Sequence, residues 1–102
     1  MPNVVWTPSA EQDLESIFLY IGREQRSPAA AAAVIRAVVD KADTYAAEPL
    51  LAAVRPEFGF DIRSFHVHRY VIFYRSVDEG IEVIRVIHGS RDVFRVFRQQ
   101  EL

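Results

Sequence analysis

Two helix-start signals, Thr7-Pro8 and Ser27-Pro28, constrain the fold of this chain more than any other feature. Threonine and serine cap helix N-termini, and proline fits the first helical turn because its missing N–H would be unbonded there. Apolar residues recur at helical spacing after each signal. We therefore predict two amphipathic helices, one from residue 8 to about residue 24 and one from residue 28 to residue 48, where Pro49 ends it.

The spacing also predicts which side of each helix is buried. The connection between the helices is only a few residues long, so the two should pack as an antiparallel hairpin with these sides turned toward the core. The predicted buried positions are Ala10, Leu14, Ile17, Phe18 and Ile21 in the first helix, and Ala31, Val34, Ile35, Val38, Ala42 and Tyr45 in the second.

β-Rich runs surround the two helices. Asn3–Trp6 precedes the first helix, and three runs follow the second, over residues 60–67, 68–76 and 81–88. The segment "VDEG" between the last two is a hairpin signal, so these strands should pair antiparallel. The order βααβββ predicts one α+β domain over residues 1–102, with the helical hairpin packed on an antiparallel sheet.

Strand alternation predicts a sheet that is apolar on both faces. Tyr70, Ile72 and Tyr74 should point one way and Val71, Phe73 and Arg75 the other. In the last strand, alternation groups Ile81, Val83, Arg85 and Ile87 on one face. One helical hairpin covers only one face, so the C-terminal segment, a second copy or a different protein should cover the other.

Composition excludes several classes of protein. No cysteine occurs, which rules out disulfides and thiolate zinc sites. No run approaches the roughly 18 apolar residues of a membrane span, and no signal peptide is recognisable, so we expect a cytoplasmic protein without a membrane partner. The formal net charge of −2 argues against direct sequence-specific nucleic-acid binding, and no motif implies a cofactor.

Histidines are the first candidates for chemistry. His66 and His68 are two apart in a predicted strand, so both would face the same side and could share a metal ion. No third ligand stands at a suitable spacing, and we therefore predict no metal site.

His88 is the stronger catalytic candidate. Cleavage of RNA through its 2′-hydroxyl needs a base, an acid and cations that stabilise the phosphorane charge. Arg63, Arg85 and Arg91 could supply the cations, with His88 or Glu57 as proton carrier. The hypothesis is that these side chains form a ribonuclease site.

A structural role for the same segment is the alternative. Gly89 and Ser90 would then form the turn that leaves the last strand, while Arg91 and Asp92 would form an ion pair locally or with a neighbouring strand end.

Three segments resemble one family in order and spacing. They are "VVWTPSAEQDLESIFLYI", "VRPEFGFDIRSFHVHRYVIFYR" and "IEVIRVIHGSRD", and they are similar to the ParE branch of the RelE/ParE superfamily of bacterial toxin–antitoxin systems. The resemblance implies a helical hairpin on an antiparallel sheet, a ParD-like antitoxin that forms a hetero-oligomer with the toxin, and DNA gyrase as target. It implies binding of gyrase rather than catalysis.

The other branch of the superfamily leaves alternatives open. RelE-like members cut messenger RNA on the ribosome with a cluster of basic residues and a late tyrosine or histidine. Here the only lysine, Lys41, lies in the second helix, and no tyrosine follows His88. A ribonuclease that uses His88, Arg85 and Arg63 is thus the second hypothesis, and an inactive toxin that only binds its antitoxin is the third.

Partner contacts are predicted on the sheet and on the tail. Phe94 and Phe97 are three apart, as are Arg95 and Arg98, so a short helical turn would present an apolar and a basic stripe. This tail could pack on the open sheet face or touch gyrase. The predicted partner-binding residues are Arg63, Tyr70, Tyr74, Arg85, Arg91, Phe94 and Phe97, with core positions as the alternative for the two tyrosines.

Overall fold

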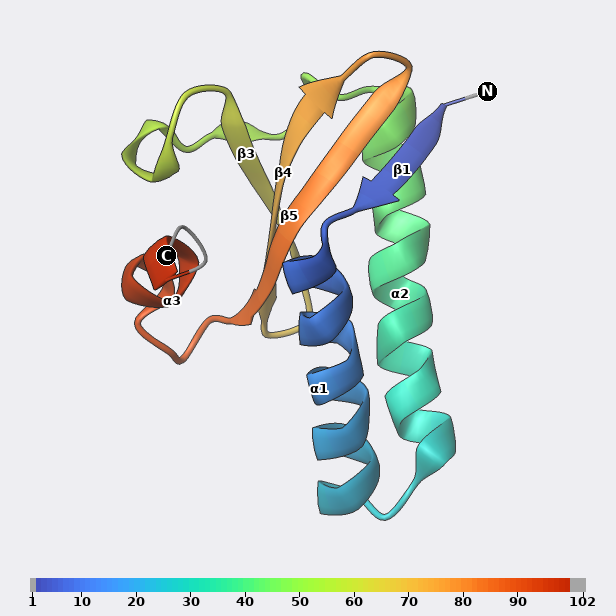
Figure 1. Ribbon diagram of the computed structural model, residues 1–102. Coiled ribbons are helices and arrows are strands. Elements are labelled where there is room, and N and C mark those ends of the chain that lie inside the picture. Colours follow the sequence, from blue (N-terminus) through green and yellow to red (C-terminus); the bar gives the residue numbers. More distant parts are fainter. Residues whose placement is uncertain (1, 100–102) are drawn as a thin grey trace.

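The computed structural model describes residues 2–99 of the chain (Figure 1). Along the chain the elements are β1 (Asn3–Trp6), α1 (Pro8–Glu24), α2 (Pro28–Ala47), β2 (Ala53–Val54), a 3-10 turn (Pro56–Phe58), β3 (Ile62–Val67), β4 (Tyr70–Val77), β5 (Gly80–His88) and α3 (Val93–Gln99).

Both predicted helix starts are confirmed. The Thr7 hydroxyl oxygen accepts a hydrogen bond from the Ala10 N–H, and the Ser27 hydroxyl oxygen accepts one from the Ala30 N–H, each at 3.1 Å. Thr7 also donates its hydroxyl proton to the Ile84 carbonyl at 2.8 Å. The same side chain therefore starts α1 and attaches it to β5.

One sheet of five strands has the order β1-β5-β4-β3-β2. The α+β class and the hairpin on a sheet are confirmed, but β1 runs parallel to β5, and β2 is a strand that the sequence did not predict. At the β4–β5 turn the backbone of Asn3 lies against Gly80, at a spot where a Cβ atom would collide with it. A glycine is therefore required there for β1 to dock.

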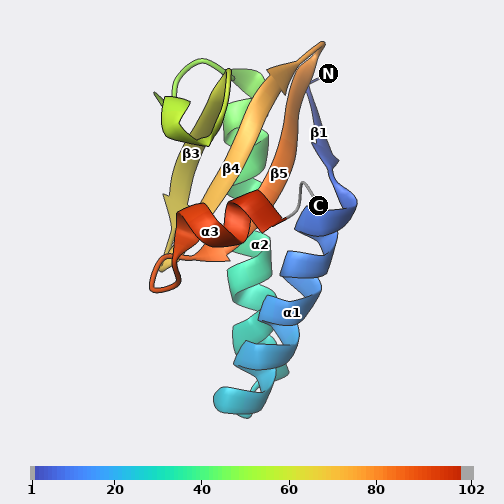
Figure 2. The same cartoon turned by 60° about the vertical axis from the view of Figure 1, so that its left-hand side comes forward.

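Helices cover both faces of the sheet. Figure 1 shows α1 and α2 on one face and α3 on the other, and Figure 2 shows α3 lying across the strands. The core beneath the hairpin includes Ile72, Tyr74, Ile81 and Val83, all completely buried. The core beneath α3 contains Val71, Phe73, Ile84, Ile87, Val96 and Phe97. The C-terminal segment therefore supplies cover for the second face.

A β-bulge changes the predicted alternation in β5. Phe73 pairs with Arg85 and Tyr74 pairs with Val83, which leaves Ile84 as an extra residue. Ile81 and Val83 pack toward the hairpin, whereas Ile87 belongs to the cluster beneath α3. The prediction that Ile81, Val83, Arg85 and Ile87 share one face is wrong, because the bulge reverses the alternation after Val83.

Three smaller predictions are also corrected. Phe18 is 39% exposed, so it lies at the rim of the helical interface rather than in it. Phe60 is 89% exposed and precedes β3, which begins only at Ile62. His68 lies in the β3–β4 turn with a φ of +53°, outside either strand.

Among residues 2–99, no helix is both long and apolar enough to cross a membrane.

Candidate functional site

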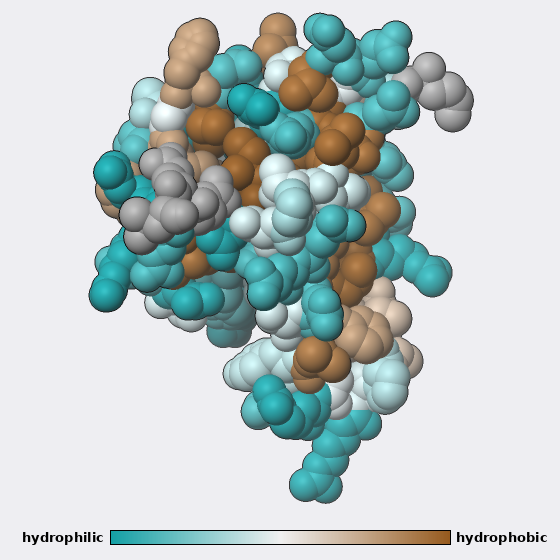
Figure 3. Space-filling view, in the orientation of Figure 1, coloured by the Kyte–Doolittle hydropathy of each residue, from teal (hydrophilic) through white to brown (hydrophobic). Residues whose placement is uncertain are grey.

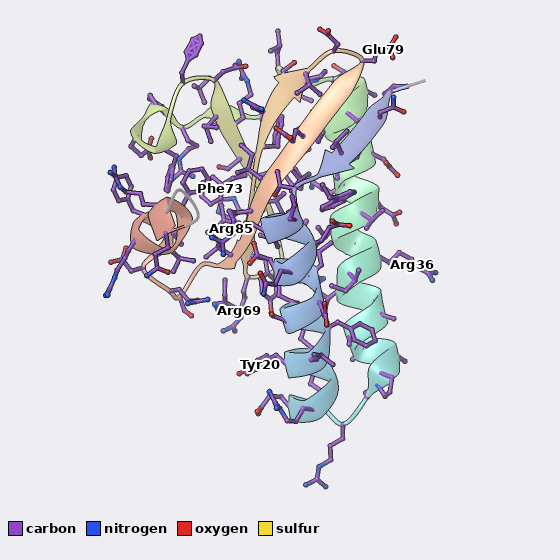
Figure 4. The ribbon with its side chains drawn as sticks, in the orientation of Figure 1. Tyr20, Arg36, Arg69, Phe73, Glu79 and Arg85 are labelled. Atoms are coloured by element: carbon purple, nitrogen blue, oxygen red, sulfur yellow. The ribbon has the colours of Figure 1, made fainter. Side chains whose placement is uncertain are left out.

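A pocket of about 380 Å³ lies between α1 and the C-terminal end of β5. Figure 4 shows Tyr20 from α1 and Arg69 from the β3–β4 turn on the same side of the molecule, below the end of the sheet. The side chains that line the pocket include Asp13, Ser16, Tyr20, Tyr70, His88, Ser90 and Arg91. The structure thus brings predicted site residues Tyr70, His88 and Arg91 together.

His88 is held by the turn that follows it. The Ser90 backbone N–H donates to His88 Nδ1 at 3.0 Å, and the Ser90 hydroxyl lies 2.7 Å from the same nitrogen. A ring nitrogen that accepts from a backbone N–H carries no proton, so the neutral ring holds its proton on Nε2. His88 therefore presents Nε2 as its hydrogen-bond donor.

Tyr70 forms the inner wall beside His88. The two rings meet edge to face with centroids 5.1 Å apart, and Tyr70 is buried. Burial raises the pKa of the Tyr70 hydroxyl, and the nearby Tyr20 raises it further. Tyr70 therefore stays a neutral phenol at physiological pH and is a poor source of a general base.

Arg85 is engaged inside the protein. Its Nε and Nη2 donate to the two carboxylate oxygens of Asp13 at 2.7 and 2.9 Å, and its Nη1 donates to the Val96 carbonyl at 3.0 Å. The Val86 N–H donates to Asp13 as well, at 2.9 Å. This network joins α1, β5 and α3, and it uses all three guanidinium nitrogens.

Arg63 is also engaged with the protein itself. Its Nη1 donates to the carbonyls of Leu50 and Ala52 at 3.1 and 2.7 Å, so the side chain holds the segment between α2 and β2. Arg63 pairs with Tyr74 across the strands, whereas His88 pairs with Tyr70. The two partner positions are four residues apart along β4, about 13 Å, and Arg63 does not line the His88 pocket.

Glu57 does not join the His88 pocket. It lies in the 3-10 turn and pairs with Arg55 at 3.0 Å. A backbone hydrogen bond, and then the bond from Arg55, lower the pKa of the Glu57 carboxyl. Glu57 thus remains ionised at neutral pH and is unsuited to donate a proton.

Arg91 and Asp92 do not form the predicted local ion pair. Asp92 instead accepts a hydrogen bond from the Arg95 N–H at 3.1 Å and so caps the start of α3. Within residues 2–99, Arg91 forms no salt bridge, and its side chain is exposed at the pocket. Arg91 is therefore available to a ligand.

The other predicted partner-binding residues differ in exposure. Tyr74 is completely buried and donates its hydroxyl proton to the Pro49 carbonyl at 2.7 Å, so it offers a partner no surface. Phe97 is also buried and belongs to the cluster beneath α3, while Phe94 is 41% exposed. The predicted short helix exists as α3, and it packs on the open face of the sheet.

No metal centre forms in the part of the chain that the structure describes. No group of three histidine, aspartate or glutamate side chains comes close enough to hold an ion. The suggested pair of His66 and His68 does not share a strand face, because His68 lies in the turn.

Sequence reasoning missed Asp13 and Tyr20. Asp13 looked like one of several acids on the polar side of α1, and its partner Arg85 is 72 residues away. Tyr20 carried a usable signal, because it is a large aromatic residue on the side of an amphipathic helix that should face water.

Comparisons with known proteins agree with this architecture. The structure named "Chromosomal ParDE TA system from P. aeruginosa" contains a chain that superimposes on this one with a TM-score of 0.72. That match has 19% sequence identity and covers 86% of this chain and 96% of the other, so it supports the fold. No curated protein matches the sequence.

The family assignment rests on a match over most of the sequence. Residues 4–93 match the family described as "ParE toxin of type II toxin-antitoxin system, parDE". The matched range includes β1 from Val4 onward, the helical hairpin, the remaining strands and the His88 pocket. The chain therefore belongs to the ParE family of toxins of type II toxin–antitoxin systems.

Proposed function

We propose that this toxin binds DNA gyrase, holds it in its DNA-cleaved state and thereby blocks replication. A ParD-like antitoxin would neutralise it by forming a hetero-oligomer, and both proteins would act in the bacterial cytoplasm, where gyrase works. The family match over residues 4–93 supports the toxin assignment, and the resemblance to the ParE branch supports gyrase as target.

The Arg85–Asp13 ion pair is the observation that favours binding over catalysis. Both side chains are largely buried, at 13% and 15% exposure, and the guanidinium also binds the Val96 carbonyl. A phosphate would have to displace a bidentate carboxylate to use Arg85 as a clamp. Arg63 is bound to two carbonyls, so two of the three arginines that a ribonuclease site would need for phosphate are already engaged within the protein.

The direct test uses the purified toxin with gyrase, supercoiled plasmid and ATP. We expect linear plasmid to accumulate after the reaction is stopped with detergent and protease, because trapped gyrase remains covalently joined to cut DNA. Intact supercoiled plasmid at all toxin concentrations, together with no detectable gyrase binding, would remove the proposal.

Two exposed phenylalanines provide a matched pair of variants. Phe94→Ala alters α3, which we propose as part of the gyrase contact, and Phe60→Ala alters a ring before β3 that is more exposed, at 89% against 41% for Phe94. We expect Phe94→Ala to weaken DNA cleavage and Phe60→Ala to leave it unchanged. Equal effects of the two would argue against α3 as the contact.

A ribosome-dependent ribonuclease is the second candidate, favoured by the position of His88 beside Arg91 in one pocket. Expression without antitoxin in cells would then cut messenger RNA and leave the chromosome intact, and His88→Gln would abolish the cuts. Neither cut message nor trapped gyrase, with antitoxin binding retained, would identify a toxin that only binds its antitoxin.

A further inference from the structure

We propose that the His88 pocket binds the carboxylate of an acidic side chain carried by a partly apolar peptide segment of a partner protein. The inference rests on the proposed function in one respect, since the antitoxin is the partner expected to supply that segment. The occupant would place its carboxylate between Arg91 and His88 and its apolar residues along α1.

The free polar groups of the pocket are mostly donors. His88 offers Nε2–H, because Nδ1 accepts from the Ser90 N–H. Arg91 adds a guanidinium without a salt bridge among residues 2–99. Tyr20 and Ser16 contribute hydroxyls on the facing side of the pocket. Such a set is complementary to an anion.

The one carboxylate in the lining is already neutralised. Asp13 accepts two hydrogen bonds from Arg85 and one from the Val86 N–H, so its charge is balanced and its oxygens are occupied. Among residues 2–99, the unpaired charge in the lining is therefore that of Arg91, and Figure 4 shows Arg69 on the same side of the molecule. The Gly89 N–H donates to the Arg69 carbonyl at 2.8 Å, which keeps that turn beside the pocket.

The apolar part of the pocket favours a peptide over a polyanion. Ile17, Val86 and Ile87 form part of its wall, and the exposed Leu19 lies on α1 one turn after the lining residue Ser16. Figure 3 shows that the lower half of the helical hairpin projects beyond the rest of the molecule, which leaves this side of α1 open to a partner. With a net charge of −2, the chain has no broad positive field for nucleic acid.

The test measures binding of two short peptides to the full-length protein by NMR. The probes are acetyl-Leu-Glu-Leu-Phe-amide and the same peptide with glutamine in place of glutamate. We expect the acidic peptide to shift the amide resonances of Tyr20, Ser90 and Arg91, with an affinity about tenfold above that of the glutamine peptide, because a charge-assisted hydrogen bond is lost.

Two arginine variants localise the effect. Arg91→Gln should lower the affinity for the acidic peptide by about tenfold and leave the affinity for the glutamine peptide unchanged. Arg95→Gln removes another exposed charge, from α3 and outside the pocket, and should change neither affinity. Both substitutions are at exposed positions, so folded protein is expected for each, and the NMR spectrum verifies it.

Three outcomes would overturn the inference: equal affinities for the two peptides, equal effects of the two arginine variants, or no shifts at the pocket up to millimolar peptide. Stronger binding of hexathymidylate than of the acidic peptide at the same resonances would reassign the pocket to nucleic acid. Gyrase takes no part in this test. The peptide result would therefore stand even if the toxin proved not to bind gyrase.

Discussion

The two faces of the sheet are covered in different ways. The hairpin face is covered by α1 and α2, helices of 17 and 20 residues, and its central side chains have no exposed surface. The opposite face is covered by α3, which has seven residues and buries only Val96 and Phe97. The first face is a continuous core, whereas the second depends on a short terminal helix.

Aromatic contacts hold the second face. Phe97 meets Phe73 with ring centroids 5.0 Å apart and meets Phe58 at 5.2 Å. Phe58 in turn contacts Phe73 at 4.5 Å and Phe94 at 5.5 Å. Figure 4 places Phe73 in the sheet where it faces α3. Because α3 is short and buries few side chains, we expect it to detach while the hairpin face stays intact.

Truncation beneath the hairpin should have the largest effect. Ile72→Ala removes a completely buried side chain from the continuous core, and we expect the free energy of unfolding to fall by about 4 kcal/mol. Urea denaturation measures the change. Val39→Ala on the outer side of α2 is the control and should stay within about 0.5 kcal/mol of the wild type. A loss below about 1 kcal/mol for Ile72→Ala would contradict a continuous core on this face.

Loss of the ion pair between Arg85 and Asp13 should have the second-largest effect on stability. Asp13→Ala leaves the mostly buried Arg85 without its counter-charge and the Val86 N–H without its acceptor, and we expect a loss of about 3 kcal/mol. Glu82→Gln breaks the more exposed pair with Arg75 and should lower stability by about 0.5 kcal/mol. Thermal and urea unfolding compare the two variants, and similar losses would show that burial of the Asp13 pair is unimportant.

Truncation beneath α3 should have a smaller effect. Phe97→Ala is expected to lower the free energy of unfolding by about 2 kcal/mol, below the usual range for an enclosed phenylalanine, because α3 can detach rather than leave a cavity. Hydrogen exchange should show lost protection in α3 and unchanged protection in β4. Uniform loss of protection across both elements would mean that the two faces unfold as one unit.

The smallest effect is expected from Tyr74→Phe. This change removes the hydrogen bond to the Pro49 carbonyl and should lower stability by about 1 kcal/mol at neutral pH. Burial raises the pKa of Tyr74 above its ordinary value of 10.0, so the unfolded chain releases the proton first. Stability should thus fall as pH rises above 10, and the fall should be shallower in the variant. Unfolding between pH 9 and 11 tests this, and identical slopes would count against it.

Local signals explain most of what the sequence predicted. The caps at Thr7 and Ser27 depend only on residues in the next turn, so both helix starts could be predicted from the local sequence. The three later strands follow from alternation and a turn. The short helix α3 follows from the spacing of Phe94 and Phe97, but its docking on the sheet was one of several alternatives.

Long-range geometry explains what the sequence did not predict. The bulge at Ile84 arises from pairing with β4, and nothing in the residue order of β5 marks it. The parallel placement of β1 depends on Gly80 and Asn3, which are far apart in the chain. For the pocket, His88 and Arg91 could be found from one motif, but Asp13 and Tyr20 enter it only because α1 lies against β5.

The attachment of β1 and α1 to β5 sets the timing of folding during synthesis. Thr7 binds the carbonyl of Ile84, 77 residues later in the chain. A ribosome that adds roughly 5–20 residues per second needs about 4–15 s between the two. β1 therefore cannot take its place in the sheet until β5 has been synthesised, although the two strands are neighbours in the folded protein.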